Sequence, residues 1–127
     1  MSDDSTSVSL PWVTGYSFWV HGYSAGHSHL LMRGKANSGD DVVNILFESV
    51  SFMSLHTHYP EVTFRRISPE EAKCGVLPNR GFLYIAIQGL TNIGLVVCGR
   101  MTARRSPSPD YFGYESDILL NISASGD

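Results

Sequence analysis

Two pairs of histidines stand out in this chain because a single residue separates the members of each pair. The pairs are His27-Ser28-His29 and His56-Thr57-His58. Residues two apart on a strand point to the same side, so both imidazoles of a pair could reach one ion. Neutral imidazole is a common ligand of zinc, iron and other divalent metals. The spacing therefore makes a metal site one hypothesis, and plain solvated histidines are the other.

Other catalytic patterns give little support for an enzyme. The chain has no glycine-rich phosphate loop before a helix and no Cys-x-x-Cys. The acids Asp40-Asp41 and Glu70-Glu71 are consecutive, and consecutive side chains on a strand point to opposite faces. We therefore expect a binding protein rather than an enzyme.

The elements that must position these residues are strands. Short runs rich in Val, Ile, Phe and Tyr alternate with Gly, Asn, Asp, Ser and Pro, as is typical of strands and turns. We expect strands over 16–22, 28–35, 42–48, 50–56, 61–67, 82–88, 93–103 and 117–122. One short helix is expected over 68–73, because Ser68 is a good cap and Pro69 suits the first helical position.

This pattern predicts an all-β fold, an antiparallel sandwich or partly open barrel of about seven or eight strands with at most one short helix. At 127 residues the chain has the size of one domain and can bury about two thirds of its unfolded surface. We expect a flexible leader at 1–9, a single all-β domain at 10–122 and a flexible tail at 123–127.

The turn at 36–41 predicts how the strands on either side of it pair. If Lys35 pairs with Val42, one side of the hairpin becomes apolar throughout, as a buried face requires. The pairs on that side are Leu30 with Phe47, Met32 with Ile45 and Gly34 with Val43. A slip of one residue would destroy this arrangement.

The other side of the hairpin then places Arg33 opposite Asn44 and His29 opposite Glu48, with His27 nearby. Two histidines and a glutamate form the ligand set of a facial triad for iron or another divalent metal. An ordinary cross-strand pair of His29 and Glu48, or a histidine acting without metal, would fit the same residues. All three interpretations stay open at this stage.

In the strand expected at 42–48 the core candidates, up to Phe47, have odd residue numbers. The next core candidates, Val50 and Phe52, have even numbers. Strict alternation cannot change in this way without an extra residue, so we expect a bulge or bend near Glu48-Ser49. The runs 82–88 and 93–101 are apolar at both odd and even positions. We therefore expect both strands to be central in a sheet and covered on both faces.

The segment Arg104 to Ser116 reads as a long linker between two strands, with prolines and three aromatic residues. A loop of this length in a compact domain is often functional. Its candidate binding residues are Arg104, Arg105, Tyr111, Phe112 and Tyr114, the residue types that concentrate at protein interfaces. Arg33 and Asn44 on the hairpin are further candidates.

The charge and composition of the chain limit the kinds of partner that we expect it to bind. The formal charge is -3, and the basic residues are scattered except for Arg65-Arg66 and Arg104-Arg105, which argues against a nucleic-acid footprint. No run is long enough for a membrane span, and the first residues lack the pattern of a secretory signal, so we expect a cytoplasmic protein. We expect Cys74 and Cys98 to be free thiols, Cys98 in the core.

The paired histidines also match part of the first motif of the cupins, which are small metal-binding β-barrels. His27 and His29 fit that motif, but its glutamate falls on Arg33 or Gly34, and no histidine follows His58 to serve the second motif. The carry-over of cupin ligands therefore ends at His27 and His29.

Over residues 12–58, with "GHSHLLMRG" followed by "VVNILFESVSF", the chain resembles small β-rich bacterial proteins of unassigned function. Some of these are immunity proteins that bind and block a toxin. The resemblance implies a cytoplasmic protein-binding module without catalysis or cofactor. The alternative is a β-barrel that binds a divalent metal or a small molecule through His27, His29 and Glu48. A homodimer formed by an uncovered edge strand fits either hypothesis.

Overall fold

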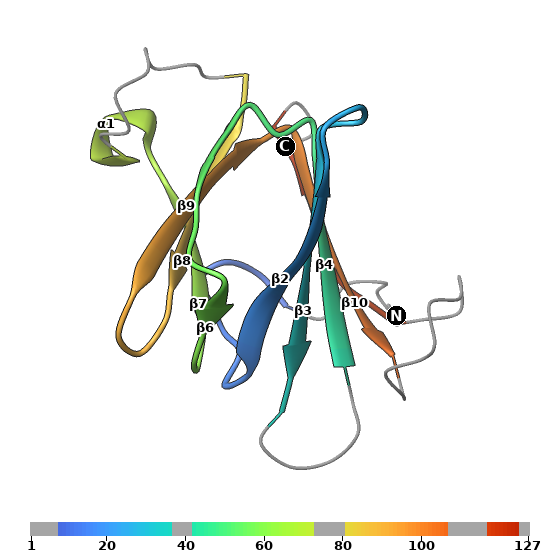
Figure 1. Ribbon diagram of the computed structural model, residues 1–127. Helices are drawn as coiled ribbons and strands as arrows, with labels where there is room; N and C mark the ends of the chain where they lie inside the picture. The colour runs from blue at the N-terminus through green and yellow to red at the C-terminus, as the bar shows by residue number, and fades with distance from the viewer. Residues whose placement is uncertain (1–7, 37–41, 73–80, 107–116, 125–127) are drawn as a thin grey trace, which may run out of the picture.

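A computed structural model describes residues 8–36, 42–72, 81–106 and 117–124 of the chain (Figure 1). These residues form eleven strands and one short helix. The strands are β1 (Trp12–Val13), β2 (Ser17–Ser24), β3 (His29–Lys35), β4 (Val42–Glu48), β5 (Phe52–Ser54), β6 (His58–Tyr59), β7 (Thr63–Ile67), β8 (Leu83–Gln88), β9 (Ile93–Cys98), β10 (Arg100–Ser106) and β11 (Asp117–Ser123). The helix, α1, covers Pro69–Ala72.

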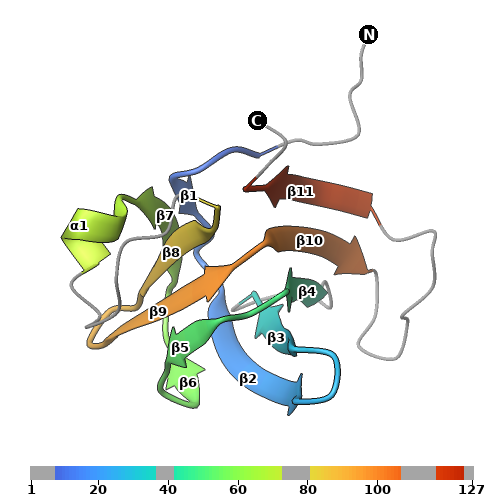
Figure 2. The same ribbon diagram turned by 90° about the horizontal axis from the view of Figure 1, so that it is seen from above.

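The strands build two antiparallel sheets that pack face to face, so the predicted all-β sandwich is confirmed (Figure 2). The five-stranded sheet has the order β1-β7-β8-β9-β5, and the six-stranded sheet has the order β11-β10-β4-β3-β2-β6. More strands form than we expected, for two reasons. The run 93–103 divides at Gly99 into β9 and β10, and two-residue strands, β1 and β6, pair along neighbours that lie far away in the sequence.

The hairpin of β3 and β4 has the predicted register. Leu30 lies opposite Phe47, and Met32 lies opposite Ile45. All four side chains are fully buried between the sheets. The apolar face of the hairpin therefore supplies a large part of the core, and the residues between these positions point to the outer side of the six-stranded sheet.

Two chain segments pass from one sheet to the other at the same place. The predicted bend follows Glu48, where Ser49 has a φ of 56° and the chain leaves β4 for β5. The second segment passes from β9 to β10 through Gly99, whose N–H donates to the Glu48 carbonyl at 2.8 Å. A Cβ on Gly99 would lie 3.1 Å from the Cβ of Ser49, so a larger residue there would have to push the bend aside. These crossings connect β4 and β10, inside the six-stranded sheet, with β5 and β9 of the five-stranded sheet (Figure 2).

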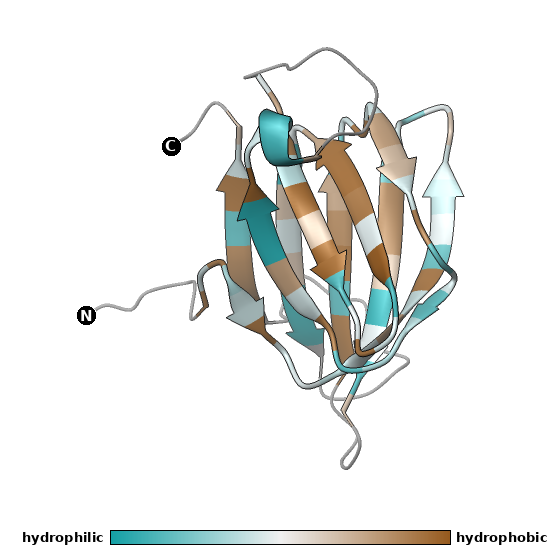
Figure 3. Cartoon of the chain, turned by 90° about the vertical axis from the view of Figure 1, so that its left-hand side faces the viewer, coloured by the Kyte–Doolittle hydropathy of each residue, from teal (hydrophilic) through white to brown (hydrophobic). Residues whose placement is uncertain are grey.

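The centre of the five-stranded sheet is β8, as its apolar pattern predicted. All its residues from Leu83 to Ile87 are buried, and α1 packs against this strand. Figure 3 shows the hydrophilic helix in front of the mainly hydrophobic strands. The helix begins as expected, since the Ser68 hydroxyl accepts a hydrogen bond from the N–H of Glu71 at 3.0 Å. The described residues contain no helix that is long and apolar enough to cross a membrane.

Both ends of the described chain contact the core. The N–H of Val8 donates to the Leu119 carbonyl at 3.0 Å, and the N–H of Ala124 donates to the Gly99 carbonyl at 2.9 Å. Val8 and Ala124 also pack against the buried cluster. Residues 1–7 and 125–127 of the predicted leader and tail lie outside the described residues.

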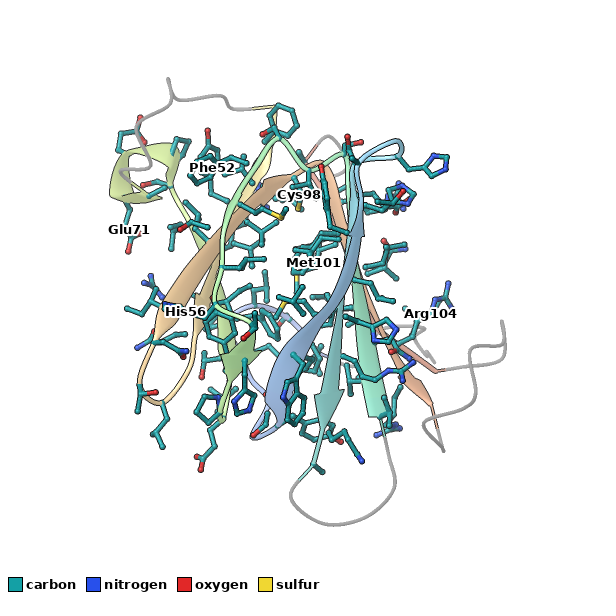
Figure 4. The ribbon with its side chains drawn as sticks, viewed as in Figure 1. Phe52, His56, Glu71, Cys98, Met101 and Arg104 are labelled. Atoms are coloured by element: carbon teal, nitrogen blue, oxygen red, sulfur yellow. The ribbon has the colours of Figure 1, made fainter. Side chains whose placement is uncertain are left out.

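Two polar side chains lie deep between the sheets. Burial raises the pKa of the Cys98 thiol to about 12, and the side chain is a free cysteine near Met101 in the interior (Figure 4). Tyr59 is fully buried, and burial also raises the pKa of its hydroxyl, which accepts a hydrogen bond from the N–H of His56 at 2.7 Å. Cys98 thus occupies the core position that the sequence predicted, whereas Cys74 lies outside the described residues.

A substitution at Gly94 tests the packing around Tyr59. A Cβ at Gly94 would collide with the Tyr59 hydroxyl, so we expect Gly94→Ala to lower the free energy of unfolding by about 1–3 kcal/mol. Urea denaturation measures this change. Gly22→Ala is the matched control, because a Cβ at Gly22 meets nothing within 4 Å. Equal effects of the two substitutions would contradict the packing described for Tyr59.

The raised pKa of Cys98 predicts a loss of stability at alkaline pH. The unfolded thiol releases its proton near pH 9.0, but the folded thiol does so only near 12, so the folded state binds more protons between these values. The free energy of unfolding should therefore fall as pH rises through this window, by up to about 1.4 kcal/mol per pH unit. Denaturation curves from pH 8 to 11 measure the slope. Cys98→Val should flatten it, and an unchanged slope in that variant would refute the assignment.

Candidate functional site

The outer face of the six-stranded sheet carries a row of polar and aromatic residues that crosses neighbouring strands. Successive Cα partners place its members side by side. From β6 to β10 they are His58, Trp19, Arg33, Asn44 and Arg104, which we call the outer row. The sequence predicted the pairing of Arg33 with Asn44. It did not predict the other neighbours, because β2, β6 and β10 join this sheet through long-range pairing.

Direct contacts hold two parts of the outer row in place. Trp19 stacks on His58 with ring centroids 4.6 Å apart and planes inclined by 18°. The Nε of Arg33 donates a hydrogen bond to the Asn44 Oδ1 at 3.0 Å. Trp19 nevertheless keeps 41% of its surface exposed, and Arg104 points away from the interior (Figure 4). The row therefore presents an ordered aromatic ring and an outward cation to solvent.

The charge of this face differs from the charge of the whole chain. The described side chains on the outer positions of β3, β4 and β10 include four cations and one carboxylate. The cations are Arg33, Lys35, Arg100 and Arg104, and the carboxylate is Glu48. Although the chain has a formal charge of -3, this face is thus locally positive.

Arg104 and Arg105 do not belong to the linker that the sequence predicted. Strand β10 continues to Ser106, because its backbone pairs with β4 on one side and with β11 on the other. Arg104 faces outward in the outer row, and Arg105 lies opposite Val43 at the exposed end of the strand. The other predicted binding residues, Tyr111, Phe112 and Tyr114, lie outside the described residues.

His29 and Glu48 meet on the same outer face, as the hairpin register predicted. The His29 Nε2 lies 3.8 Å from the Glu48 Oε2, and both side chains remain more than one third exposed. His27 lies in the turn before β3, and its ring centroid is 5.7 Å from that of His29. The described residues contain no group of three His, Cys, Asp or Glu side chains arranged to hold a metal ion. In the described structure His29 and Glu48 thus form a cross-strand pair, and His27 lies beside His29.

The second histidine pair does not join the first. His58 stacks on Trp19, whereas the ring of His56 meets the edge of Tyr59 at a centroid distance of 5.8 Å. The two rings of this pair therefore have different aromatic partners. They do not share a ligand position in the described structure.

A further pattern, which we did not identify from the sequence, is Gly22-Tyr23-Ser24-Ala25-Gly26, a match to the Gly-x-Ser-x-Gly of hydrolases. Ser24 is the Cα partner of His29, which in turn lies beside Glu48. In hydrolases this pattern forms a sharp turn between a strand and a helix. Here it ends β2 and leads into β3, and no side-chain hydrogen bond joins Ser24 to His29 among the described contacts. The match therefore lacks the structural context of a nucleophile.

An apolar pocket of ≈270 Å³ opens where β2 and β5 approach each other. Its wall includes Val20, Leu30 and Leu55, and Tyr23 and Met53 line it while remaining 42% and 37% exposed. The N–H of Val20 donates to the Thr57 carbonyl beside this pocket. Because consecutive side chains on a strand point to opposite faces, Val20 and this pocket lie on the core-facing side of β2, whereas Trp19 lies on its outer face.

Comparison of the chain with protein-family models, curated proteins and solved structures finds no match in any of the three. The resemblance to immunity proteins over residues 12–58 therefore stays a prediction. The candidate functions follow from the described residues alone.

The His29–Glu48 pair gives a prediction that separates the two candidate functions. Because an exposed ion pair contributes little, we expect His29→Ala and Glu48→Gln each to change the free energy of unfolding by less than about 1 kcal/mol. We also expect the melting temperature to be unaffected by a chelator. Stoichiometric zinc, iron or manganese in the purified protein, lost in the variant with His27→Ala and His29→Ala, would instead establish a metal site.

Proposed function

We propose that this protein is a non-catalytic binding module that recognises another protein through the outer row. The observation that carries the proposal is the alignment of Trp19, Arg33 and Arg104 across one exposed sheet face. Tryptophan and arginine are the residue types most enriched at the energetic centres of protein interfaces. The immunity-type role and the cytoplasmic location predicted from the sequence are part of this proposal.

The chemistry of the face indicates the kind of partner. Its cations favour an acidic partner surface, since complementary charge steers association and suppresses wrong partners. Arginine forms paired hydrogen bonds with carboxylates, which adds geometric specificity. The partner that fits best therefore presents Asp or Glu side chains opposite Arg104, since the Nε of Arg33 already donates to Asn44 and its Nη2 is buried.

The pocket between β2 and β5 offers a second apolar contact at the edge of the sandwich, on the other face of β2 from Trp19. Tyrosine and methionine are enriched in interface cores, and here Tyr23 and Met53 line the pocket and remain partly exposed. One large apolar side chain of a partner that reaches around the edge of the six-stranded sheet would fit there. The uncharged edge of β5 beside this pocket is also where a second copy could pair, so a homodimer remains part of the proposal.

The proposal predicts that binding depends on the outer row. We expect a variant with Trp19→Ala and Arg104→Glu to lose about tenfold or more in affinity for the partner while remaining folded. The matched control carries Leu90→Ala and Arg65→Glu, which alter an exposed apolar residue outside the outer row and an arginine on the other sheet. Quantitative pull-downs from an extract of the native host identify the partner, and titration with the purified partner gives the dissociation constants.

The expected result is one protein retained by the wild type and the control variant but lost by the outer-row variant. Retention by all three proteins would contradict the proposed surface. Salt-sensitive binding of a single-stranded oligonucleotide at this face, in the absence of any protein partner, would contradict the partner class. Hydrolysis of p-nitrophenyl acetate that disappears in Ser24→Ala would contradict a non-catalytic role.

A further inference from the structure

A second pocket, of ≈370 Å³, lies at the other open side of the sandwich, between β7 and β11. Residues 8–11 run between β1 and β11 on this side (Figure 2). Four aliphatic side chains line the pocket: Val8, Leu10, Leu120 and Ile122. Its volume lies within the range of about 300–1,000 Å³ that is usual for small-molecule sites.

One cation, Arg66, also lines this pocket and occupies an unexpected position on its strand. Arg66 pairs with Ile85, just as Phe64 two residues earlier pairs with Ile87. Phe64, Ile85 and Ile87 are fully buried in the core. Arg66 therefore stands on the core-facing side of β7, where the strand extends beyond its partner β1 and the side chain is exposed at the pocket.

The neighbouring Arg65 differs from Arg66 because it has a carboxylate partner. Arg65 faces the other side of β7, where its Nη1 lies 3.1 Å from the Glu71 Oε2. In the described part of the chain, Arg66 makes no ion pair with a carboxylate and no side-chain hydrogen bond. A guanidinium that borders an apolar pocket without such a partner is complementary to an anion that carries an apolar body.

We propose that this pocket binds an amphipathic monocarboxylate, such as a medium-chain fatty acid. The apolar chain lies against Leu10, Leu120 and Ile122, and the carboxylate accepts hydrogen bonds from the Arg66 guanidinium. Ser9 also lines the pocket and adds a polar group beside it, whereas the Asn121 Oδ1 accepts a hydrogen bond from the Arg100 Nη1 at 3.3 Å. This site is independent of the outer row, because the pocket opens between the sheets at β7 and β11, the outer row lies on the outer face of the six-stranded sheet, and the two share no residue.

The inward position of Arg66 has another explanation, which the experiment must separate from ligand binding. Charged residues that face inward at a strand edge prevent that edge from pairing with another molecule. In that case Arg66→Gln would promote association of the protein with itself and would leave the affinity for a carboxylate unchanged.

The test is a titration of the full chain with octanoate, followed by NMR of methyl groups and by light scattering. We expect saturable shifts at Leu10, Leu120 and Ile122. Octan-1-ol, which has the same chain length without the charge, should bind roughly tenfold or more weakly. Arg66→Gln should remove this preference for the carboxylate, whereas Arg65→Gln, on the opposite face of the same strand, should keep it.

Several results would overturn the proposal. These are the absence of saturable shifts up to the solubility limit of octanoate, equal affinity for octan-1-ol, and unchanged octanoate affinity in Arg66→Gln. Shifts confined to Val20, Leu30 and Leu55 would place the chain of the ligand in the pocket between β2 and β5 and would equally overturn the proposal. Self-association of Arg66→Gln with unchanged octanoate binding would assign Arg66 to edge protection.

Discussion

The register of β3 against β4 is the constraint on which the rest of the structure depends. With Met32 opposite Ile45, one face of the hairpin is apolar and closes the core, and the same register places Arg33 beside Asn44 on the outside. A slip of one residue would exchange the two faces, exposing the apolar side chains and burying the polar ones, at a large cost in free energy. Core and candidate binding face are therefore two consequences of one pairing.

The bend after Glu48 links this hairpin to the second sheet. Ser49 and Gly99 pass each other closely there, so the segments that join β4 to β5 and β9 to β10 constrain each other, and the sandwich is open at the two sides that carry the pockets. Each open side carries a pocket, and the chemistry of the two pockets differs. The pocket between β2 and β5 has the partly exposed Tyr23 and Met53 in its wall, whereas the other combines aliphatic walls with Arg66.

The features of the fold that could be predicted from the sequence are those that local sequence patterns determine. The β3–β4 register, the bend at Ser49 and the helix cap at Ser68 all follow from residues close together in the chain, and the structure confirms them. The place of Trp19 beside His58 could not be predicted, because a two-residue strand pairs there after a long excursion of the chain. The same holds for the Arg66 pocket, whose walls come from opposite ends of the sequence.

The most direct test of this account is a measurement of the β3–β4 register by NMR in solution. Cross-strand nuclear Overhauser effects should connect the backbone protons of Leu31 with those of Leu46, and those of Met32 with those of Ile45. Effects that instead connect Met32 with Leu46 or with Asn44 would show a register shifted by one residue. That result would contradict both the buried core and the outer row.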